Sequence, residues 1–158
     1  SCETCPSGTF PKLSKDACGD CDPGQFVNGS LCSSCQTGRY APTAVSGECI
    51  LCAAGFATNN VTSEATSCSS CAAGFYSPAG SIKCFSCSPG TFSGSRSESC
   101  TNCSAGTYNT VVEATSCINC VSGKYAPEGK TACIDCAKGK KSSARAEVCV
   151  DCAAGKYS

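Results

Sequence analysis

Large apolar residues are widely spaced along this chain, and they recur at a nearly constant interval. The segments between them are polar and rich in Gly, Pro, Asn and Ser, and none shows the 3.6-residue periodicity of a helix. The pattern predicts short extended segments that are broken by turns every few residues. The recurring residues are mostly aromatic: Phe10, Phe26, Tyr40, Tyr76, Phe92, Tyr108, Tyr125 and Tyr157.

Each of these aromatics belongs to a fixed motif that begins with a cysteine. Glycine stands three positions after that cysteine in ten of ten places, and the aromatic stands five positions after it in eight. Residues 1–158 therefore form one tandem array of about ten repeats, each predicted to be an irregular β-hairpin. We name each repeat by its opening cysteine, the second of a Cys-x-x-Cys pair: Cys5, Cys21, Cys35, Cys52, Cys71, Cys87, Cys103, Cys120, Cys136 and Cys152.

The conserved spacing assigns physical roles to the glycine and the aromatic. Glycine at a fixed place suggests a positive φ angle or a close approach of neighbouring backbone. The aromatic offers one large apolar surface per repeat, which suits it to cover a disulfide. Two repeats depart from the rule, with Ala57 and Lys141 at the aromatic position. Phe56 is a candidate substitute beside Ala57, whereas no such residue stands near Lys141.

A longer period is visible from Cys52 onward. Residues 76–80 (Tyr-Ser-Pro-Ala-Gly) return 49 positions later as residues 125–129 (Tyr-Ala-Pro-Glu-Gly), and Glu64–Cys68 returns as Glu113–Cys117. Duplication of a three-repeat block explains this period without any structural meaning. Alternatively, three repeats return the chain to the same face of a twisted rod. Duplication is favoured, because a copied block keeps its period whatever the geometry.

The composition indicates the compartment and excludes several classes of partner. Twenty of 158 residues are cysteine, while Trp, Met and His are absent. This cysteine content is typical of a disulfide scaffold in an oxidising, extracellular or cell-surface location. Twelve basic and twelve acidic residues are scattered singly, so neither nucleic acid nor an anionic membrane surface is expected as a partner. No apolar run approaches the length of a membrane span, so no direct membrane insertion is expected.

No leader sequence is recognisable in the chain. The sequence begins one residue before Cys2 and stops within a repeat at Ser158. We therefore expect it to be an excerpt of a longer secreted chain.

The cysteine spacing also fits a second kind of chemistry. Two Cys-x-x-Cys pairs separated by a dozen residues can supply the four thiolates of a zinc site. The gaps within repeats are all alike, however, histidine is absent, and sequons for N-glycosylation indicate the secretory route. Thioredoxin-like redox chemistry requires a βαβ context, which is not apparent. We expect no metal and no cofactor.

If the thiols are oxidised, a bridge within Cys-x-x-Cys closes too small a ring to hold a hairpin together. Pairing the opening cysteine of a repeat with the cysteine that closes it cross-links the hairpin base, and each loop then contributes about 3 kcal/mol in the chain-entropy estimate. Other connectivities remain formally possible, and Cys2 and Cys152 are left without partners. The expected bridges are Cys5–Cys18, Cys21–Cys32, Cys35–Cys49, Cys52–Cys68, Cys71–Cys84, Cys87–Cys100, Cys103–Cys117, Cys120–Cys133 and Cys136–Cys149.

The motif Cys-x-x-Gly-x-aromatic, a turn and then Cys-x-x-Cys resembles the ephrin-receptor-like cysteine-rich repeat. It is also similar to the single-disulfide module of tumour-necrosis-factor receptors, and such repeats occur in many protist and algal surface proteins. In that module the first cysteine pairs with the next one along, which supports the bridges above, and the aromatic packs over the disulfide. The resemblance covers essentially the whole chain, but the two-disulfide module that alternates with the first in those receptors is missing. It implies a small disulfide-rich fold, which we expect to be an elongated rod of stacked hairpins with little or no helix and no concave pocket.

Three sequons for N-glycosylation are present, at Asn28, Asn60 and Asn102. Asn60 lies in the longest loop and is expected to be the best acceptor, followed by Asn28 at an Asn-Gly turn. Asn102 lies between two bridged cysteines, where we expect access to be poor.

The remaining residues favour a structural function over catalysis. Without histidine, neither a Ser-His nor a Cys-His nucleophile is available, so we expect no enzyme activity and no catalytic residues. We expect an extracellular, self-associating structural rod, as in a surface coat, stalk or filament, with copies of itself, or glycans, as partners. The alternative is a ligand- or adhesion-binding ectodomain of a cell-surface receptor. Phe85, which lies outside the motif, is the best candidate contact residue for such binding, although packing against the next repeat is the commoner explanation.

Overall fold

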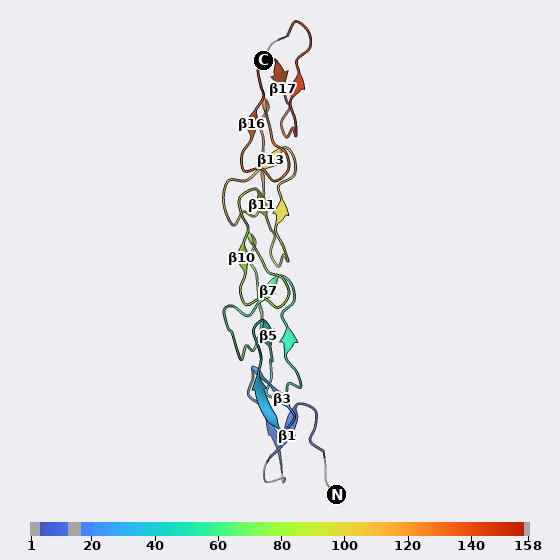
Figure 1. Cartoon of the computed structure of the whole chain (residues 1–158), viewed down its shortest axis with the longest axis vertical. Helices are drawn as coiled ribbons and strands as arrows, with labels where there is room; N and C mark the ends of the chain where they lie inside the picture. The colour runs from blue at the N-terminus through green and yellow to red at the C-terminus, as the bar shows by residue number, and fades with distance from the viewer. Residues whose placement is uncertain (1–3, 13–16, 157–158) are drawn as a thin grey trace. The chain divides into compact units, whose positions relative to one another are not determined.

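A computed structural model describes residues 4–12 and 17–156 of the chain. Within this part, regular secondary structure consists of eighteen short strands, and no helix occurs among the described residues. The strands pair in sequence order into nine antiparallel hairpins, each a separate two-stranded sheet (Figure 1). The predicted class, a small disulfide-rich repeat fold of hairpins, is confirmed.

Each hairpin joins strands that are adjacent in the sequence. The pairs in the first half are β1 (Thr9–Pro11) with β2 (Cys18–Asp20), β3 (Gln25–Asn28) with β4 (Leu31–Ser34), β5 (Arg39–Tyr40) with β6 (Ile50–Leu51) and β7 (Phe56–Ala57) with β8 (Ser69–Ser70). The later pairs are β9 (Phe75–Tyr76) with β10 (Phe85–Ser86), β11 (Thr91–Phe92) with β12 (Thr101–Asn102), β13 (Thr107–Tyr108) with β14 (Ile118–Asn119), β15 (Lys124–Tyr125) with β16 (Ile134–Asp135) and β17 (Lys140–Lys141) with β18 (Val150–Asp151).

The register places the aromatic of each motif opposite a residue of the next Cys-x-x-Cys pair. Tyr40 lies opposite Ile50, and Tyr125 lies opposite Ile134. Directly opposed side chains share one face of a hairpin. The first variable position of Cys-x-x-Cys is therefore the cross-strand neighbour of the aromatic.

The ten motif glycines share one backbone conformation. All of them have positive φ angles, between 72° and 89°, which confirms the expectation from the sequence. These residues are Gly8, Gly24, Gly38, Gly55, Gly74, Gly90, Gly106, Gly123, Gly139 and Gly155. The glycine ends the turn after the opening cysteine, so the left-handed conformation directs the chain into the first strand of each hairpin.

A second left-handed position lies in the distal loop of the six repeats from Cys52 to Cys136, and we call it the turn position. It is occupied by Glu64, Gly80, Arg96, Glu113, Gly129 and Arg145, whose φ angles lie between 58° and 74°. The residue types at this position follow the order Glu, Gly, Arg twice, so they repeat with the 49-residue period seen in the sequence. The backbone conformation is the same at all six places, so a single repeat, not the block of three, is the unit of local geometry.

The chain divides into two compact units. The first contains Ser1–Cys71 and Ser77–Cys84, and the second contains Ala72–Tyr76 and Phe85–Ser158. In the first unit a small apolar cluster forms from Cys35, Ala41 and Cys49, and Phe26 packs against it. The aromatic of the Cys21 repeat therefore packs against the disulfide of the following repeat, Cys35–Cys49.

Nine disulfides close the hairpins at their bases. They join the same nine pairs that the sequence led us to expect, from Cys5–Cys18 to Cys136–Cys149. Cys152 is a free, half-buried thiol among the described residues, and Cys2 lies outside them.

Candidate functional site

The seven repeats from Cys35 to Cys136 place a small side chain at the sixth position after the opening cysteine, directly after the aromatic position. We call it the inner position, and it is occupied by Ala41, Thr58, Ser77, Ser93, Asn109, Ala126 and Ser142. The first six of these side chains are at most 2% exposed, whereas the motif aromatics are only half-buried. The most completely buried side chains are therefore small ones between repeats, together with the opening cysteines.

Polar inner residues bridge one repeat to the one before it. In the first compact unit, Ser77 Oγ donates to the carbonyl of Phe56 at 3.1 Å. In the second unit, Ser93 donates to the Phe75 carbonyl at 3.0 Å, Asn109 Nδ2 to the Thr91 carbonyl at 2.9 Å and Ser142 to the Lys124 carbonyl at 2.8 Å. Each acceptor stands four positions after the opening cysteine of the preceding repeat. These bonds satisfy buried polar groups and fix the stacking distance between neighbours.

Main-chain bonds follow the same plan. The motif glycine donates its N–H to the inner residue of the next repeat, as from Gly55 to the Ser77 carbonyl and from Gly90 to the Asn109 carbonyl. In addition, the backbone N–H of the turn position donates to the carbonyl of the opening cysteine in the preceding repeat, as from Gly80 to Cys52 and from Glu113 to Cys87. Neighbouring repeats are thus linked by hydrogen bonds at two levels.

Motif glycines also contact the repeat after next. A Cβ added at Gly24 or Gly38 would overlap the carbonyl of Glu64 or Gly80, each of which lies two repeats further along. In the second unit the same relationship links Gly74 with Glu113, Gly90 with Gly129 and Gly106 with Arg145. Close backbone approach, as well as the positive φ angle, therefore excludes any side chain at these glycines.

Glu64 adds side-chain bonds to this second-neighbour contact. Its carboxylate accepts hydrogen bonds from Ser34 Oγ at 2.8 Å and from Gln25 Nε2 at 3.1 Å, both in the Cys21 repeat. Both bonds stabilise the charged carboxylate, the one from Ser34 more than the one from Gln25, and they hold the pKa of Glu64 below its ordinary value. Glu128, in the Cys120 repeat, makes a similar contact: its carboxylate accepts a hydrogen bond at 3.1 Å from Asn102 Nδ2, two repeats earlier.

Several exposed apolar side chains occupy the first variable position of Cys-x-x-Cys. In the second compact unit they are Ile118, Ile134 and Val150, which are 55%, 41% and 54% exposed. Phe85 occupies the same position of its own pair and is 39% exposed. Its ring lies 5.7 Å from that of Tyr76, its cross-strand partner, so part of Phe85 packs within its hairpin.

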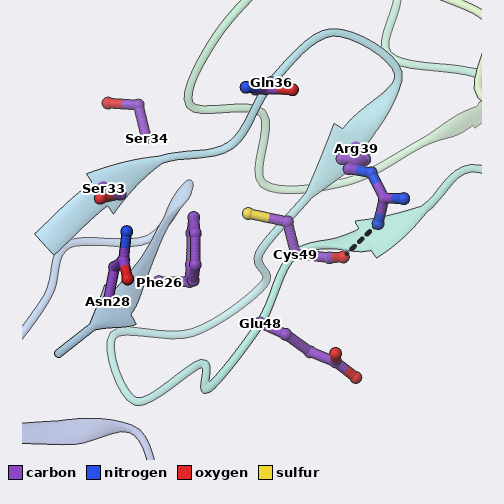
Figure 2. Close-up of a pocket in the computed structure, with 8 residues that line it drawn as sticks. All are labelled: Phe26, Asn28, Ser33, Ser34, Gln36, Arg39, Glu48 and Cys49. Atoms are coloured by element: carbon purple, nitrogen blue, oxygen red, sulfur yellow. Dashed lines mark hydrogen bonds between the residues drawn. The ribbon is translucent and has the colours of Figure 1, made fainter.

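A shallow groove of about 440 Å³ lies in the first compact unit, between the Cys21 and Cys35 repeats. Figure 2 shows the Phe26 ring at its centre, with polar side chains around it. The expectation that repeats of this kind form no concave pocket is wrong at this place. Its lining comes from both repeats: Phe26 packs against the next repeat's Cys35–Cys49 disulfide, and Asn28, Ser33 and Ser34 come from the β3–β4 hairpin.

The residues around the ring differ in how their polar atoms are used. Arg39 Nη1 donates to the Cys49 carbonyl at 3.0 Å, which the dashed line in Figure 2 marks. Among the described residues, no hydrogen bond involves the side chains of Asn28, Ser33, Gln36 or Glu48. Two amides, a hydroxyl and a carboxylate therefore face the groove with unused donors and acceptors.

All three sequon asparagines are exposed. Asn60 lies in the distal loop of the Cys52 repeat, where its backbone N–H donates to the Ile82 carbonyl. Asn28 ends β3 and lines the groove. Asn102 is not buried, and its Nδ2, the atom that takes a glycan, donates a hydrogen bond to Glu128 Oε1.

Other groups expected from the sequence are placed as follows. Eighteen cysteines are disulfide-bonded, and no group of three or more potential ligand side chains is arranged as a metal site in the part of the chain that the structure describes. Within residues 4–12 and 17–156, no helix has the length and apolar character needed to cross a bilayer.

At the aromatic position of the Cys136 repeat, Lys141 is exposed and lies opposite Val150. Tyr157, the aromatic of the Cys152 repeat, lies outside the described residues.

The inner position is the functional feature that sequence reasoning missed. Its residues are Ala, Ser, Thr and Asn, which look like ordinary loop residues when the chain is read in order. Aligning the repeats on their opening cysteines would have shown that the sixth following residue is always small in the middle of the array. No comparable signal marks the groove, because it depends on the packing of two repeats.

Comparison with known families agrees with the geometry. A family model described as "Tyrosine-protein kinase ephrin type A/B receptor-like" matches residues 24–67 and 90–124, which together make up half of the chain. No curated protein matches the chain at a significant level.

Proposed function

The chain belongs to the ephrin type A/B receptor-like family of cysteine-rich domains, and from this premise we propose that it is an extracellular structural rod that associates with copies of itself. The family and the nine disulfides indicate an extracellular or cell-surface location. The finer proposal, a component of a coat, stalk or filament, is supported by how the repeats are joined. It includes no catalytic role.

The observation that carries this proposal is the redundancy of contacts between repeats. Each compact unit contains bonds between neighbours through the inner position and backbone contacts between second neighbours through the motif glycine. Bending between two repeats would break both sets at once. An array with such coupling resists bending, as a load-bearing rod must, and it resembles other quasi-one-dimensional repeat proteins in this respect.

The exposed apolar residues supply a reason for association. Ile118, Ile134 and Val150 recur at a spacing of 16 residues, each on the exposed face of a hairpin. Equivalent apolar patches at a regular interval allow a second copy to bind in a staggered arrangement, and contacts that do not close on themselves build fibres or sheets. Each patch is small, so association requires several of them together.

Imaging of the purified protein at high concentration tests the proposal. Negative-stain micrographs are expected to show stiff, narrow particles that align into regular fibres or sheets. Ile118→Lys is expected to reduce the assembled fraction, whereas Asn119→Lys adds the same charge at the adjacent exposed position and is expected to leave it unchanged. Short isolated particles at every concentration would remove self-association from the proposal.

The alternative, a ligand- or adhesion-binding ectodomain, is supported by the groove around Phe26. An aromatic ring with unused polar groups beside it is the usual make-up of a binding site. A soluble ligand that protects the Glu48 carboxylate from carbodiimide labelling, without assembly of the protein, would favour the ectodomain over the rod.

A further inference from the structure

We propose that Asn28 carries an N-linked glycan whose first sugar lies in the groove, against the ring of Phe26. The proposal does not depend on whether the chain serves as a rod or as an ectodomain. It assigns an occupant to the groove and a reason for its polar lining.

The local sequence and its turn make Asn28 accessible. Asn28-Gly29-Ser30 is a sequon at the tip of the hairpin, where Asn28 pairs with Leu31 and the loop contains only Gly29 and Ser30. Gly29 has a φ angle of 68°, whereas Ser30 is not left-handed, as two-residue hairpin loops of type II′ require. Asn28, Gly29 and Ser30 are all exposed.

The strand geometry places the glycan beside an aromatic ring. Residues two apart in a strand point to the same face and lie about 7 Å from each other, so Phe26 and Asn28 share one face of β3. Figure 2 shows the Asn28 amide next to the Phe26 ring, and both residues line the groove. A sugar joined to the amide nitrogen can therefore lie with its C–H groups over the ring.

The surrounding side chains match the hydroxyl groups of a sugar. Ser33 is the cross-strand partner of Phe26, and Gln36 and Glu48 come from the following repeat. These side chains make no hydrogen bonds with described residues, so their donors and acceptors are available to a sugar. Sugar hydroxyls, which both donate and accept, can satisfy an amide, a hydroxyl and a carboxylate together.

The other two sequons lack this arrangement. Two residues before Asn60 stands Thr58, a buried inner residue, and two residues before Asn102 stands Cys100, which is disulfide-bonded. Asn60 lies in a loop outside any strand, and Asn102 lies opposite Thr91, so neither shares a strand face with an aromatic ring. This ranking differs from the one based on loop length, which put Asn60 first.

The attachment is an ordinary transfer of the secretory route. The donor is an oligosaccharide on a lipid pyrophosphate, and the catalyst is the host's transferase. Asn28 Nδ2 forms a bond to the anomeric carbon of the first sugar, the bond from that carbon to the pyrophosphate oxygen breaks, and the electron pair leaves with the lipid pyrophosphate. The amide proton passes to a base of the transferase. No oxidant or reductant is required.

The test uses the full chain, secreted from a eukaryotic host that attaches N-glycans. Glycopeptide mass spectrometry is expected to find Asn28 occupied, and Ser30→Ala is expected to remove the glycan from Asn28 while leaving Asn60 unchanged. An unoccupied Asn28 in the wild-type protein overturns the proposal.

Nuclear magnetic resonance of the glycan then tests its position. Ring protons of the first sugar at Asn28 are expected to shift upfield and to show Overhauser contacts to the Phe26 ring, and the sugar at Asn60, if attached, serves as an internal control. Phe26→Leu retains apolar volume over the Cys35–Cys49 disulfide but is expected to abolish the upfield shift. Cleaving the glycan from the wild-type protein is expected to lower the Tm by about 2–4 °C, and from Phe26→Leu by less.

Two results would overturn the packing of the sugar on the ring. One is an Asn28 sugar with unshifted protons and no contacts to Phe26. The other is an upfield shift that persists in Phe26→Leu, once mass mapping has shown that the variant retains its nine bridges. Neither result bears on whether the protein assembles, so failure here is distinguishable from failure of the proposed rod.

Discussion

Gly106 lies against the backbone carbonyl of Arg145, so closely that a single added carbon on Gly106 would overlap the carbonyl oxygen. The two residues are 39 positions apart and belong to repeats that are not adjacent in the sequence. Gly123, in the next repeat, has nearly the same φ angle, 81° against 79°, but an added carbon there would meet no atom within 4 Å. A comparison of Gly106 with Gly123 therefore separates two requirements for glycine: the left-handed backbone conformation and the close contact with a distant repeat.

The first prediction compares Gly106→Ala with Gly123→Ala. Both substitutions place alanine in the left-handed region, at a cost of about 1–2 kcal/mol. Gly106→Ala must in addition displace the Arg145 carbonyl, which we expect to cost about 1–3 kcal/mol more. Urea unfolding of the two variants measures the difference.

Equal destabilisation by both substitutions would show that the second-neighbour contact contributes nothing. Non-reducing mass analysis of each variant is the control, since a lost disulfide would mimic the effect.

The repeat, its hairpins and the positive φ of its glycines could be predicted because each depends on residues close in the sequence. A cysteine, a glycine and an aromatic at fixed spacing specify one local conformation, and the order of cysteines favoured one set of bridges. The contact between Gly106 and Arg145 could not be predicted in the same way, because no local sequence pattern indicates which residue of a distant repeat a glycine will contact. The groove beside Phe26 was missed for the same reason, since its lining comes from two repeats and its aromatic looked like an ordinary framework residue.

The second prediction concerns the buried polar side chains at the inner position. Ser93→Ala removes one hydrogen bond, to the Phe75 carbonyl, and is expected to cost about 1 kcal/mol. Alanine is tolerated there because Ala41 and Ala126 occupy the same position elsewhere. Asn109→Ala removes bonds to the Thr91 and Val111 carbonyls and one from the Val111 N–H, and is expected to cost about 2–4 kcal/mol.

Chemical denaturation of both variants provides the measurement, and Ser95→Ala, at an exposed loop residue, is the matched control. If Asn109→Ala were no more destabilising than Ser95→Ala, the inner position would not be a point of coupling between repeats.

The third prediction is a pH dependence that arises at Glu64. Hydrogen bonds from Ser34 and Gln25 favour the carboxylate, so the pKa of Glu64 is lower in the folded state than in the unfolded state. A depressed folded pKa contributes stability above the unfolded value, near 4.3, and this contribution disappears as the pH falls through the folded pKa. Glu64→Gln is therefore expected to be less stable than wild type at pH 7 and to approach it below pH 4.

Urea midpoints at pH 7 and pH 3 check this prediction, with Glu98→Gln as a control at an exposed glutamate that has no side-chain hydrogen bond to a described residue. A constant gap between wild type and Glu64→Gln at both pH values would show that the two bonds do not stabilise the charged form.

The last prediction concerns the covalent framework itself. Peptide mapping without reduction is expected to return nine loop-closing links, each within one repeat, because only these bridges tie the two strands of a hairpin together at the base. Replacing Cys87 and Cys100 together by alanine is expected to cost about 2–5 kcal/mol, since the chain between them is then free in the unfolded state. Links between different repeats would contradict the hairpin assignment, and metal in stoichiometric amount with free thiols would revive the zinc interpretation of the same cysteine spacing. The double variant also tests coupling along the array: if inner-position bonds join neighbours as strongly as the structure indicates, loss of this one bridge should increase proteolysis in the adjacent Cys71 and Cys103 repeats as well as in its own.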